Sequence, residues 1–167
     1  PVLGNYTVTL DENIAAGTAV QTVAATDADG DTVSYSITGG NTGGIFAIDA
    51  STGAITIAAG KTLDYETATS HNITVLATST DGSSNSQVFN ILVTNAGDNP
   101  VVGPTDNNGA ANTVAENAAN GTAVGITALA TDADAGTTIS YSLTDNAGGR
   151  FAINATTGVG TAHDGTL

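Results

Sequence analysis

The chain has 167 residues, with sixteen acidic and only two basic side chains, and a formal net charge of −14. Two cations, Lys61 and Arg150, cannot form the basic surface that nucleic acids require, and no apolar run is long enough to span a membrane. The absence of Cys excludes disulfides and thiol chemistry. A secreted domain of this composition therefore needs another source of stabilisation, and bound metal ions are one candidate.

Short segments in which apolar and polar residues alternate follow one another along residues 1–99, separated by Gly-rich turns. Strands are predicted at residues 5–10, 19–25, 32–37, 45–48, 54–57, 71–79 and 86–94. No helical periodicity is present. This pattern predicts an all-β fold, a seven-strand antiparallel Greek-key β-sandwich of the immunoglobulin-like kind.

Most of this first unit recurs further along the chain. The matching segments are "LDENIAAGTAV" (10–20) with "VAENAANGTAV" (114–124), "ATDADGDTVSYSI" (25–37) with "ATDADAGTTISYSL" (130–143), and "GGIFAIDASTGAI" (43–55) with "GGRFAINATTGVG" (148–160). Phe46 and Phe151 stand 105 positions apart, a spacing typical of whole domains in tandem rather than of a solenoid.

The repeat predicts the domain organisation. We expect a complete sandwich over residues 1–99, a linker over 100–104 within the Pro- and Gly-containing stretch "NAGDNPVVGP", and a second, truncated copy over 105–167. The second copy has no counterpart of the last two predicted strands. We therefore expect residues 105–167 to be strained, partly ordered or completed by another chain.

Acidic residues gather at the ends of the predicted strands. In the extended stretch Asp27-Ala28-Asp29, both aspartates point to the same side, and Asp132-Ala133-Asp134 repeats the arrangement. Clustered carboxylates without His or Cys nearby suit Ca²⁺, which binds six to eight hard oxygen ligands. Isolated aspartates such as Asp49 and Asp106 are expected in turns, whose local geometry Asp favours.

Taken together, these motifs resemble the cadherin repeat, in the form found in large bacterial surface and secreted adhesins. The motifs that carry the resemblance are "DEN" with Glu12, "TDADG" with Asp27 and Asp29, "LDYE" with Asp64 and Glu66, "ATSTDG" with Asp81, and "NAGDNP" with Asp98 and Asn99. Two linker positions depart from the family pattern: Asn95 stands where Asp is usual, and Gly97 where Asn is usual.

The resemblance implies Ca²⁺ ions shared between consecutive repeats. The implied junction ligands are Glu12, Asp64, Glu66, Asp98 and Asn99 from the first unit and Asp132 and Asp134 from the second. Asp27, Asp29 and Asp81 would serve a junction with a preceding repeat, and Glu116 a junction with a following one. The implied partners are neighbouring repeats of the same protein.

The sequence is consistent with two functions. The first is a calcium-stiffened, extracellular or cell-surface rod of an adhesion protein, and the low Lys, Arg and Cys content is consistent with a bacterial source. The second is calcium-dependent carbohydrate or polysaccharide binding, for which Tyr65 is the main exposed aromatic candidate. An enzyme is not expected, because neither His71 nor His163 has a plausible catalytic relay and no nucleophile motif is present.

Overall fold

The computed structural model describes residues 1–164. The chain divides into two compact units, unit 1 (Pro1–Ala96) and unit 2 (from Gly97 onward). β10, the strand Val102–Asp106 of unit 2, begins inside the range that the sequence analysis assigned to a linker. Within residues 1–164 no helix has the length and apolar character needed to cross a bilayer.

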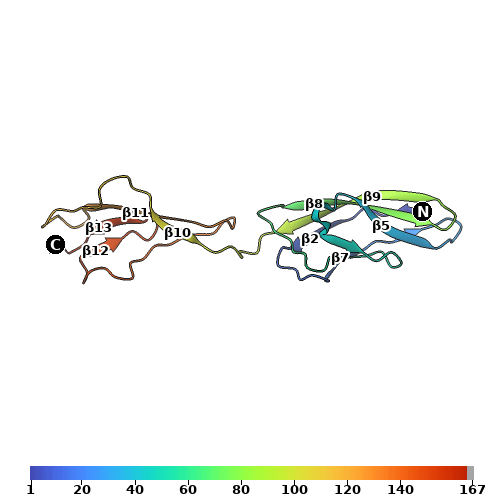
Figure 1. The fold of residues 1–167 in the computed structure, drawn as a ribbon, viewed down its shortest axis with the longest axis horizontal. Helices are drawn as coiled ribbons and strands as arrows, with labels where there is room; N and C mark the ends of the chain where they lie inside the picture. Colours follow the sequence, from blue (N-terminus) through green and yellow to red (C-terminus); the bar gives the residue numbers. More distant parts are fainter. Residues whose placement is uncertain (165–167) are drawn as a thin grey trace. The chain divides into compact units, whose positions relative to one another are not determined.

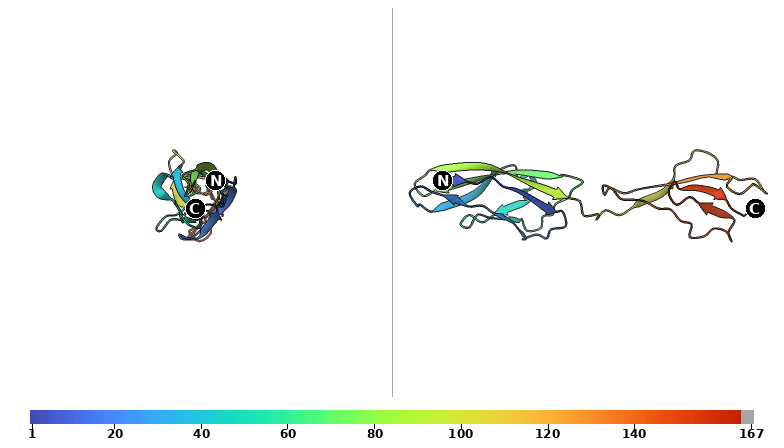
Figure 2. Two further views of the ribbon diagram at one scale, coloured as in Figure 1. Left: turned by 90° about the vertical axis from the view of Figure 1, so that its right-hand side faces the viewer. Right: turned by 180° about the vertical axis from the view of Figure 1, so that it is seen from behind.

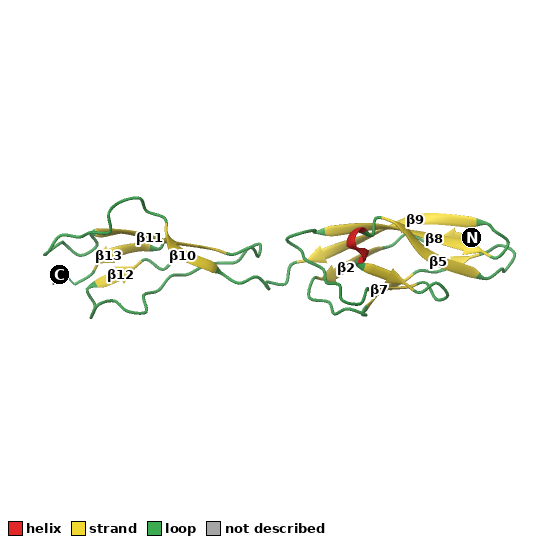
Figure 3. Ribbon diagram, viewed as in Figure 1, coloured by secondary structure: helices red, strands yellow, loops and turns green. Residues whose placement is uncertain are grey.

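Unit 1 is a two-layer β-sandwich (Figure 1). Its strands are β1 (Val2–Leu3), β2 (Thr7–Asp11), β3 (Ala19–Thr22), β4 (Ala25–Thr26), β5 (Val33–Gly39), β6 (Phe46–Ile48), β7 (Ala54–Ile57), β8 (Ser70–Ser79) and β9 (Ser84–Thr94). One layer is the sheet β2-β9-β8-β5 and the other is the sheet β3-β7-β6, while β1 and β4 form a separate two-stranded pair. The short 3-10 helix η1 (Thr42–Gly44) stands out in red among the strands in Figure 3.

The predicted β-sandwich is confirmed, but the expectation of purely antiparallel pairing is wrong at one place. β2 runs parallel to β9, with Thr7 opposite Asn90 and Leu10 opposite Val93. The N-terminal segment pairs first with β4 through β1 and then crosses to the other sheet as β2. Because the chain enters and leaves unit 1 at opposite ends, its first and last long strands run in the same direction (Figure 2).

The core lies between the two layers. Its buried members are Leu10, Val23, Phe46, Ile55, Ile57, Leu63, Ile73, Val75, Phe89, Ile91 and Val93. The alternation of β8 and β9 places Ile73 and Val75 inward on one strand and Phe89 and Ile91 inward on the other. Full burial of each such side chain contributes about 1.5–3 kcal/mol, which makes this hairpin a main source of stability.

Unit 2 contains a four-stranded sheet of order β10-β11-β13-β12. Its strands are β10, β11 (Ala123–Thr131), β12 (Phe151–Ile153) and β13 (Val159–Ala162). β12 and β13 pair as β6 and β7 do in unit 1. Residues 137–143, which match β5 in sequence, are not assigned to a strand. In unit 1, β5 lies at the edge of its sheet and pairs with β8. Residues 137–143 have no such paired neighbour among residues 1–164, and they are therefore not assigned to a strand.

Equivalent backbone hydrogen bonds occur at matching positions of the two units. Tyr35 N–H donates to Ala50 O and Tyr141 N–H to Ala155 O, both at 2.9 Å. The turn after β6 closes with Gly53, whose φ of +72° is matched by +70° at Gly158. A Cβ at Gly53 would overlap a backbone carbonyl oxygen, so this turn requires glycine for space as well as for its backbone angle.

Candidate metal centre

Glu12 is the most buried acidic residue of unit 1, with 3% of its surface exposed. It follows directly on β2, where the strand turns away from the sheet. Its Oε2 accepts the Tyr65 N–H at 2.7 Å, and its Oε1 accepts the Ala96 N–H at 2.6 Å. These two charge-assisted hydrogen bonds hold the carboxylate between the loop before β8 and the end of the unit.

Asp64 and Glu66 lie beside Glu12, and the carboxylate oxygens of the three residues come within 4.8 Å of one another. Asp64 is oriented by Thr67, whose N–H donates to Oδ1 at 2.8 Å and whose hydroxyl donates to Oδ2 at 2.7 Å. The Thr67 hydroxyl and amide hold the pKa of Asp64 below its ordinary value. Glu66 Oε1 accepts a hydrogen bond from Asn95 Nδ2 at 2.7 Å.

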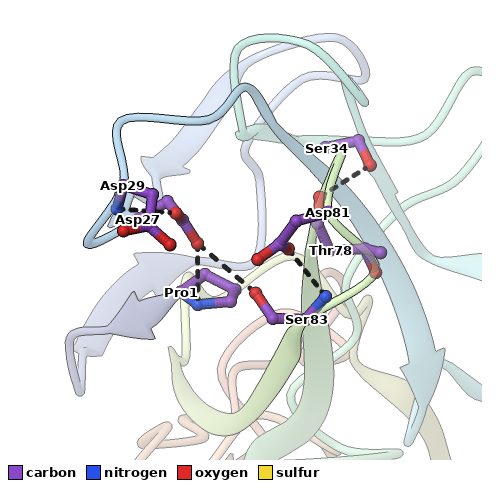
Figure 4. Close-up of polar contacts among 7 residues, drawn as sticks. All are labelled: Pro1, Asp27, Asp29, Ser34, Thr78, Asp81 and Ser83. Atoms are coloured by element: carbon purple, nitrogen blue, oxygen red, sulfur yellow. Dashed lines mark hydrogen bonds and ion pairs between the residues drawn. The ribbon is translucent and has the colours of Figure 1, made fainter.

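A second cluster at the opposite end of unit 1 contains Asp27, Asp29 and Asp81, again with carboxylate oxygens within 4.8 Å of one another (Figure 4). Asp27 Oδ1 accepts the Asp29 N–H at 3.1 Å, and this bond is the main cause of the lowered pKa of Asp27. The amino group of Pro1 lies 3.4 Å from Asp27 Oδ2.

Ser83 connects the two sides of this second cluster. Its N–H donates to Asp81 Oδ1 at 2.8 Å, and its hydroxyl donates to Asp27 Oδ2 at 3.4 Å. The Ser83 amide is also the main cause of the lowered pKa of Asp81. Beside the cluster, the Ser34 hydroxyl donates to Thr78 O and links β5 to β8 (Figure 4).

The spacing in both clusters matches the requirements of a hard divalent cation. Two oxygens bound to one Ca²⁺ at about 2.3–2.6 Å lie at most about 5 Å apart. Three carboxylates at such distances repel one another, and a cation between them converts this repulsion into coordination. Hydrogen bonds from backbone amides occupy only part of the lone pairs of each carboxylate, so the remaining lone pairs can bind a metal ion.

Unit 2 gathers the other predicted ligands around Asp134, of which 7% is exposed. Asn99 N–H donates to Asp134 Oδ2 and Asn99 Nδ2 to Asp134 Oδ1, both at 3.0 Å. The Asp134 N–H in turn donates to Asp132 Oδ1 at 2.8 Å, as the Asp29 amide does to Asp27. Asp98 Oδ1 accepts Asn99 Nδ2 at 3.3 Å, so the four predicted residues of this group lie side by side.

Glu116 matches Glu12 in the repeat but lies in a different environment. It is exposed and belongs to no cluster of potential ligands among residues 1–164. Asp49 lies in a turn, as expected, and accepts the amides of Ser51 and Thr52. Asp106 is the last residue of β10 and accepts the amide of Asn108, two positions on, and that of Thr127 on β11.

The sequence analysis missed the residues that support the carboxylates, namely Thr67, Ser83 and Asn95. The first two have a recognisable signal, because a hydroxyl residue two or three positions after Asp often donates to that carboxylate. Asn95 had been noted only as a departure from the acidic residue expected there. Its amide acts as a donor to Glu66, which an aspartate in that position could not do.

The model of the cadherin domain matches residues 6–94, which is more than half of the chain. The chain belongs to the cadherin family. Cadherin repeats are extracellular domains of a non-enzymatic adhesion family. The expectations of a tandem cadherin fold, of an extracellular location and of a protein that is not an enzyme are confirmed on this ground.

Named cadherin relatives are similar over nearly the whole chain. Mouse protocadherin Fat 4 is 38% identical over 93% of this chain, and the wing polarity protein stan of Drosophila melanogaster is 37% identical over 92%. The crystal structure of mouse cadherin-23 EC22-24 matches with a TM-score of 0.78 and 29% identity, over 95% of this chain and 50% of that chain.

The chain spans only 3% and 4% of the length of these two curated relatives. Both are animal proteins, as is cadherin-23. These relatives support the prediction that the chain consists of cadherin repeats. They give no support to the prediction that it comes from a bacterial adhesin.

Proposed function

We propose that this chain is a calcium-binding pair of cadherin repeats that stiffens an extended extracellular adhesion protein. The observation that carries this proposal is the convergence of the Glu12, Asp64 and Glu66 carboxylates within 4.8 Å at one end of unit 1. All three side chains are positioned by hydrogen bonds rather than left free in solvent. Such a preorganised set of oxygens loses little conformational entropy when it binds an ion.

The proposed mechanism is electrostatic. Glu12, Asp64 and Glu66 of unit 1, together with the unit 2 group Asp98, Asn99, Asp132 and Asp134, share Ca²⁺ ions at the junction of the two repeats. Without the ion these carboxylates repel one another and the junction flexes. With the ion the repulsion becomes coordination and the junction stiffens. Asp27, Asp29 and Asp81 bind calcium at a junction with a preceding repeat. The second repeat begins with β10 in this proposal.

Calcium titration of matched variants tests the junction site. Isothermal titration of Ca²⁺ into the chain is compared with Asp64→Asn, Asp134→Asn and the control Asp145→Asn, which removes the same charge outside the proposed site. The proposal expects at least tenfold weaker binding for the first two variants and unchanged binding for the control. Equal losses in all three would mean that net charge alone attracts the ion, and would overturn the proposal.

Stiffening is a separate consequence and needs its own measurement. Small-angle scattering in Ca²⁺ and in EGTA reports the distribution of distances within the chain. A narrower distribution in Ca²⁺, lost in Asp134→Asn but kept in Asp145→Asn, supports a calcium-stiffened junction. Calcium binding without any change in this distribution would support the metal site but contradict the proposed stiffening of the junction.

Carbohydrate binding, the alternative, receives no support from the aromatic residues. Tyr65 was expected to be exposed, but it is half-buried and packs against the core of unit 1. None of the seven Tyr and Phe side chains, all of which lie within the described residues, is exposed. A glycan array that gave specific, calcium-dependent hits would revive this alternative.

A role in cell adhesion follows the family, and a bacterial surface or secreted adhesin as the parent protein remains a prediction from composition alone. Completion of unit 2 by another chain is the remaining sequence-based proposal, and the exposed side chains of Ile126 and Leu143 support it.

A further inference from the structure

Unit 2 contains both Asn-Gly dipeptides of the sequence, Asn108-Gly109 and Asn120-Gly121. In such a pair the backbone nitrogen of the glycine can attack the side-chain amide carbon of the asparagine, because glycine has no side chain to hinder the approach. The reaction needs no enzyme, and its rate depends on how the fold holds the two reacting groups. The structure holds the two pairs in different ways.

Asn108-Gly109 lies in the connection between β10 and β11, and its glycine nitrogen is unrestrained. The Gly109 N–H, which would act as the nucleophile, donates to no acceptor among residues 1–164. Gly109 is exposed, and no heavy atom lies within 4 Å of the position that a Cβ would take there. This nitrogen can therefore lose its proton and move toward the asparagine side chain without breaking a hydrogen bond.

The side-chain carbonyl of Asn108 is positioned as the electrophile. Its Oδ1 accepts the Ala110 N–H at 2.9 Å. This bond closes a ring that contains both the Asn108 Cγ and the Gly109 nitrogen, and so keeps the two reacting atoms near each other. The same N–H stabilises the negative charge that develops on Oδ1 during the attack. Asn108 Nδ2, the leaving nitrogen, donates to the Thr127 hydroxyl at 3.5 Å.

Asn120-Gly121 has neither feature. The Gly121 N–H donates to Ala162 O, and the Ala162 N–H donates to Thr122 O, both at 2.8 Å. This pair of bonds fixes the glycine nitrogen between the start of β11 and the end of β13. Asn120 is exposed, and its side-chain carbonyl accepts no hydrogen bond within the described part of the chain. Attack at this site would have to break a backbone hydrogen bond first.

Asn154 provides a comparison of the opposite kind. Its Oδ1 accepts the N–H groups of Thr156 and Thr157 at 2.9 Å, so its carbonyl is polarised as that of Asn108 is. The next residue is Ala155, whose methyl group hinders the attack. Of the three asparagines, only Asn108 combines a polarised carbonyl with an unrestrained glycine nitrogen.

We propose that Asn108 is a self-modification site, at which the chain converts its own side-chain amide into a carboxylate through a succinimide. The Gly109 nitrogen forms a bond to Asn108 Cγ, the Cγ–Nδ2 bond breaks, and the leaving nitrogen takes the Gly109 proton and departs as ammonia. Water then opens the succinimide ring. Opening at Cγ gives aspartate, and opening at the backbone carbonyl carbon gives isoaspartate, whose main chain runs through the former side chain.

The product places a new negative charge beside Asp106. Asp106 Oδ1 accepts the N–H of Asn108 at 3.0 Å and that of Thr127 at 3.1 Å, and so joins the end of β10 to β11. A second carboxylate at position 108 repels that of Asp106, and isoaspartate also lengthens the backbone within this link. Modification therefore loosens the β10–β11 connection. It involves none of the proposed calcium ligands, so it stands or falls separately from calcium binding.

The test follows deamidation by mass spectrometry while the full chain is incubated at neutral pH. A protease that cleaves after glutamate cuts at Glu66 and Glu116, and so separates Asn108 from Asn120 and Asn154. The proposal expects Asn108 to react at least tenfold faster than either of the others in the folded chain. In urea the two Asn-Gly pairs should react at similar rates, because the fold no longer distinguishes them. Equal rates in the folded chain, or an unchanged ratio in urea, would overturn the proposal.

Three variants separate the nucleophile from the carbonyl donor. Gly109→Ala adds a methyl group that meets no neighbouring atom, so the fold tolerates it, and the reaction at Asn108 should become at least tenfold slower. Ala110→Pro removes the N–H that binds Oδ1 and should also slow the reaction. Ala110→Gly keeps this N–H and should retain the rate. An unchanged rate in Ala110→Pro, or an equal loss in Ala110→Gly, would overturn the assigned geometry.

Hydrogen exchange measures the consequence for the fold. The Thr127 amide, which donates to Asp106, should exchange at least tenfold faster in the reacted chain than in the unreacted Gly109→Ala variant. Equal exchange in the two would show that the new charge leaves the β10–β11 connection intact, and would contradict the proposed loosening.

Discussion

Glu12 accepts a hydrogen bond from the Ala96 N–H at 2.6 Å, across 84 positions of the sequence. The same carboxylate accepts the Tyr65 N–H, so one buried side chain joins three distant segments at the end of unit 1. Both donors belong to the chain itself, so Glu12 has a structural role in addition to its proposed role as a calcium ligand.

Replacing Glu12 by Ala should destabilise unit 1 even in EGTA. The change removes two charge-assisted hydrogen bonds and leaves two amides without a partner, which costs about 2–4 kcal/mol, partly offset by weaker repulsion with Asp64 and Glu66. Urea denaturation measures the loss. Glu116→Ala, at the equivalent but exposed position, should change the free energy of unfolding by less than about 0.5 kcal/mol. Similar effects of the two variants would contradict the structural role of Glu12.

Tyr35→Phe should lower the stability of unit 1 by about 1 kcal/mol. Its hydroxyl accepts the Ala25 N–H at 2.9 Å, and removal of the hydroxyl leaves that amide unpaired. Tyr6→Phe provides the control, because the Tyr6 ring stacks on Phe89 at 5.4 Å and keeps this contact in the variant. Thermal unfolding distinguishes the two. The prediction fails if Tyr35→Phe is as stable as Tyr6→Phe.

Two glycine substitutions separate steric overlap from backbone strain. Gly53 and Gly60 have nearly the same φ, +72° and +71°, but only at Gly53 would a Cβ overlap backbone atoms. Gly60→Ala should cost about 1–2 kcal/mol, the penalty of the left-handed conformation. Gly53→Ala should cost at least about 2 kcal/mol more. Chemical denaturation of both variants checks the difference, and equal costs would show that the turn relaxes away from Val23.

Acidification should destabilise unit 1 in two stages. Burial lowers the pKa of His71 below its ordinary value of 6.5, so the unfolded state binds a proton before the folded state does. Stability contributed by neutral His71 is present above pH 6.5 and is lost as the pH falls from there through the folded-state pKa. His71→Gln should remove this first stage from a plot of unfolding free energy against pH. An unchanged slope in the variant would exclude His71 as its cause.

The second stage belongs to the aspartates. Hydrogen bonds hold the pKa values of Asp27, Asp49, Asp64 and Asp81 of unit 1 below 3.8 in the folded state. Their contribution is present above pH 3.8 and is lost as the pH falls through the folded-state values. Thr67→Val should reduce this stage by raising the pKa of Asp64, which carbon-detected NMR titration measures directly. A pKa of Asp64 that does not change would show that Thr67 is not its main partner.

Much of the fold could be predicted because strand periodicity is a local property. Alternation in "NYTVTL" places Tyr6, Val8 and Leu10 on the inner face, as the structure confirms. The predicted limits of β7 agree with the structure, and those of β8 differ by one residue. The parallel pairing of β2 with β9 was missed, because the relative direction of strands depends on how the chain crosses between layers and not on local pattern.

The candidate ligands could be predicted as residue types, but their environments could not. The expectation that Asp27 and Asp29 point to one side of an extended strand is wrong, because residues 27–30 form a turn. In this turn the Gly30 N–H donates to Asp27 O at 3.3 Å and the Asp29 N–H donates to Asp27 Oδ1 at 3.1 Å. Glu12 and Glu116 occupy matching motifs, yet one is buried and the other exposed. The difference arises because the amides that bind Glu12 come from Tyr65 and Ala96, far away in the sequence. Local pattern thus determined which side chains carry the charge. Only tertiary structure decided which of them meet partners, because those contacts join segments that are distant along the chain.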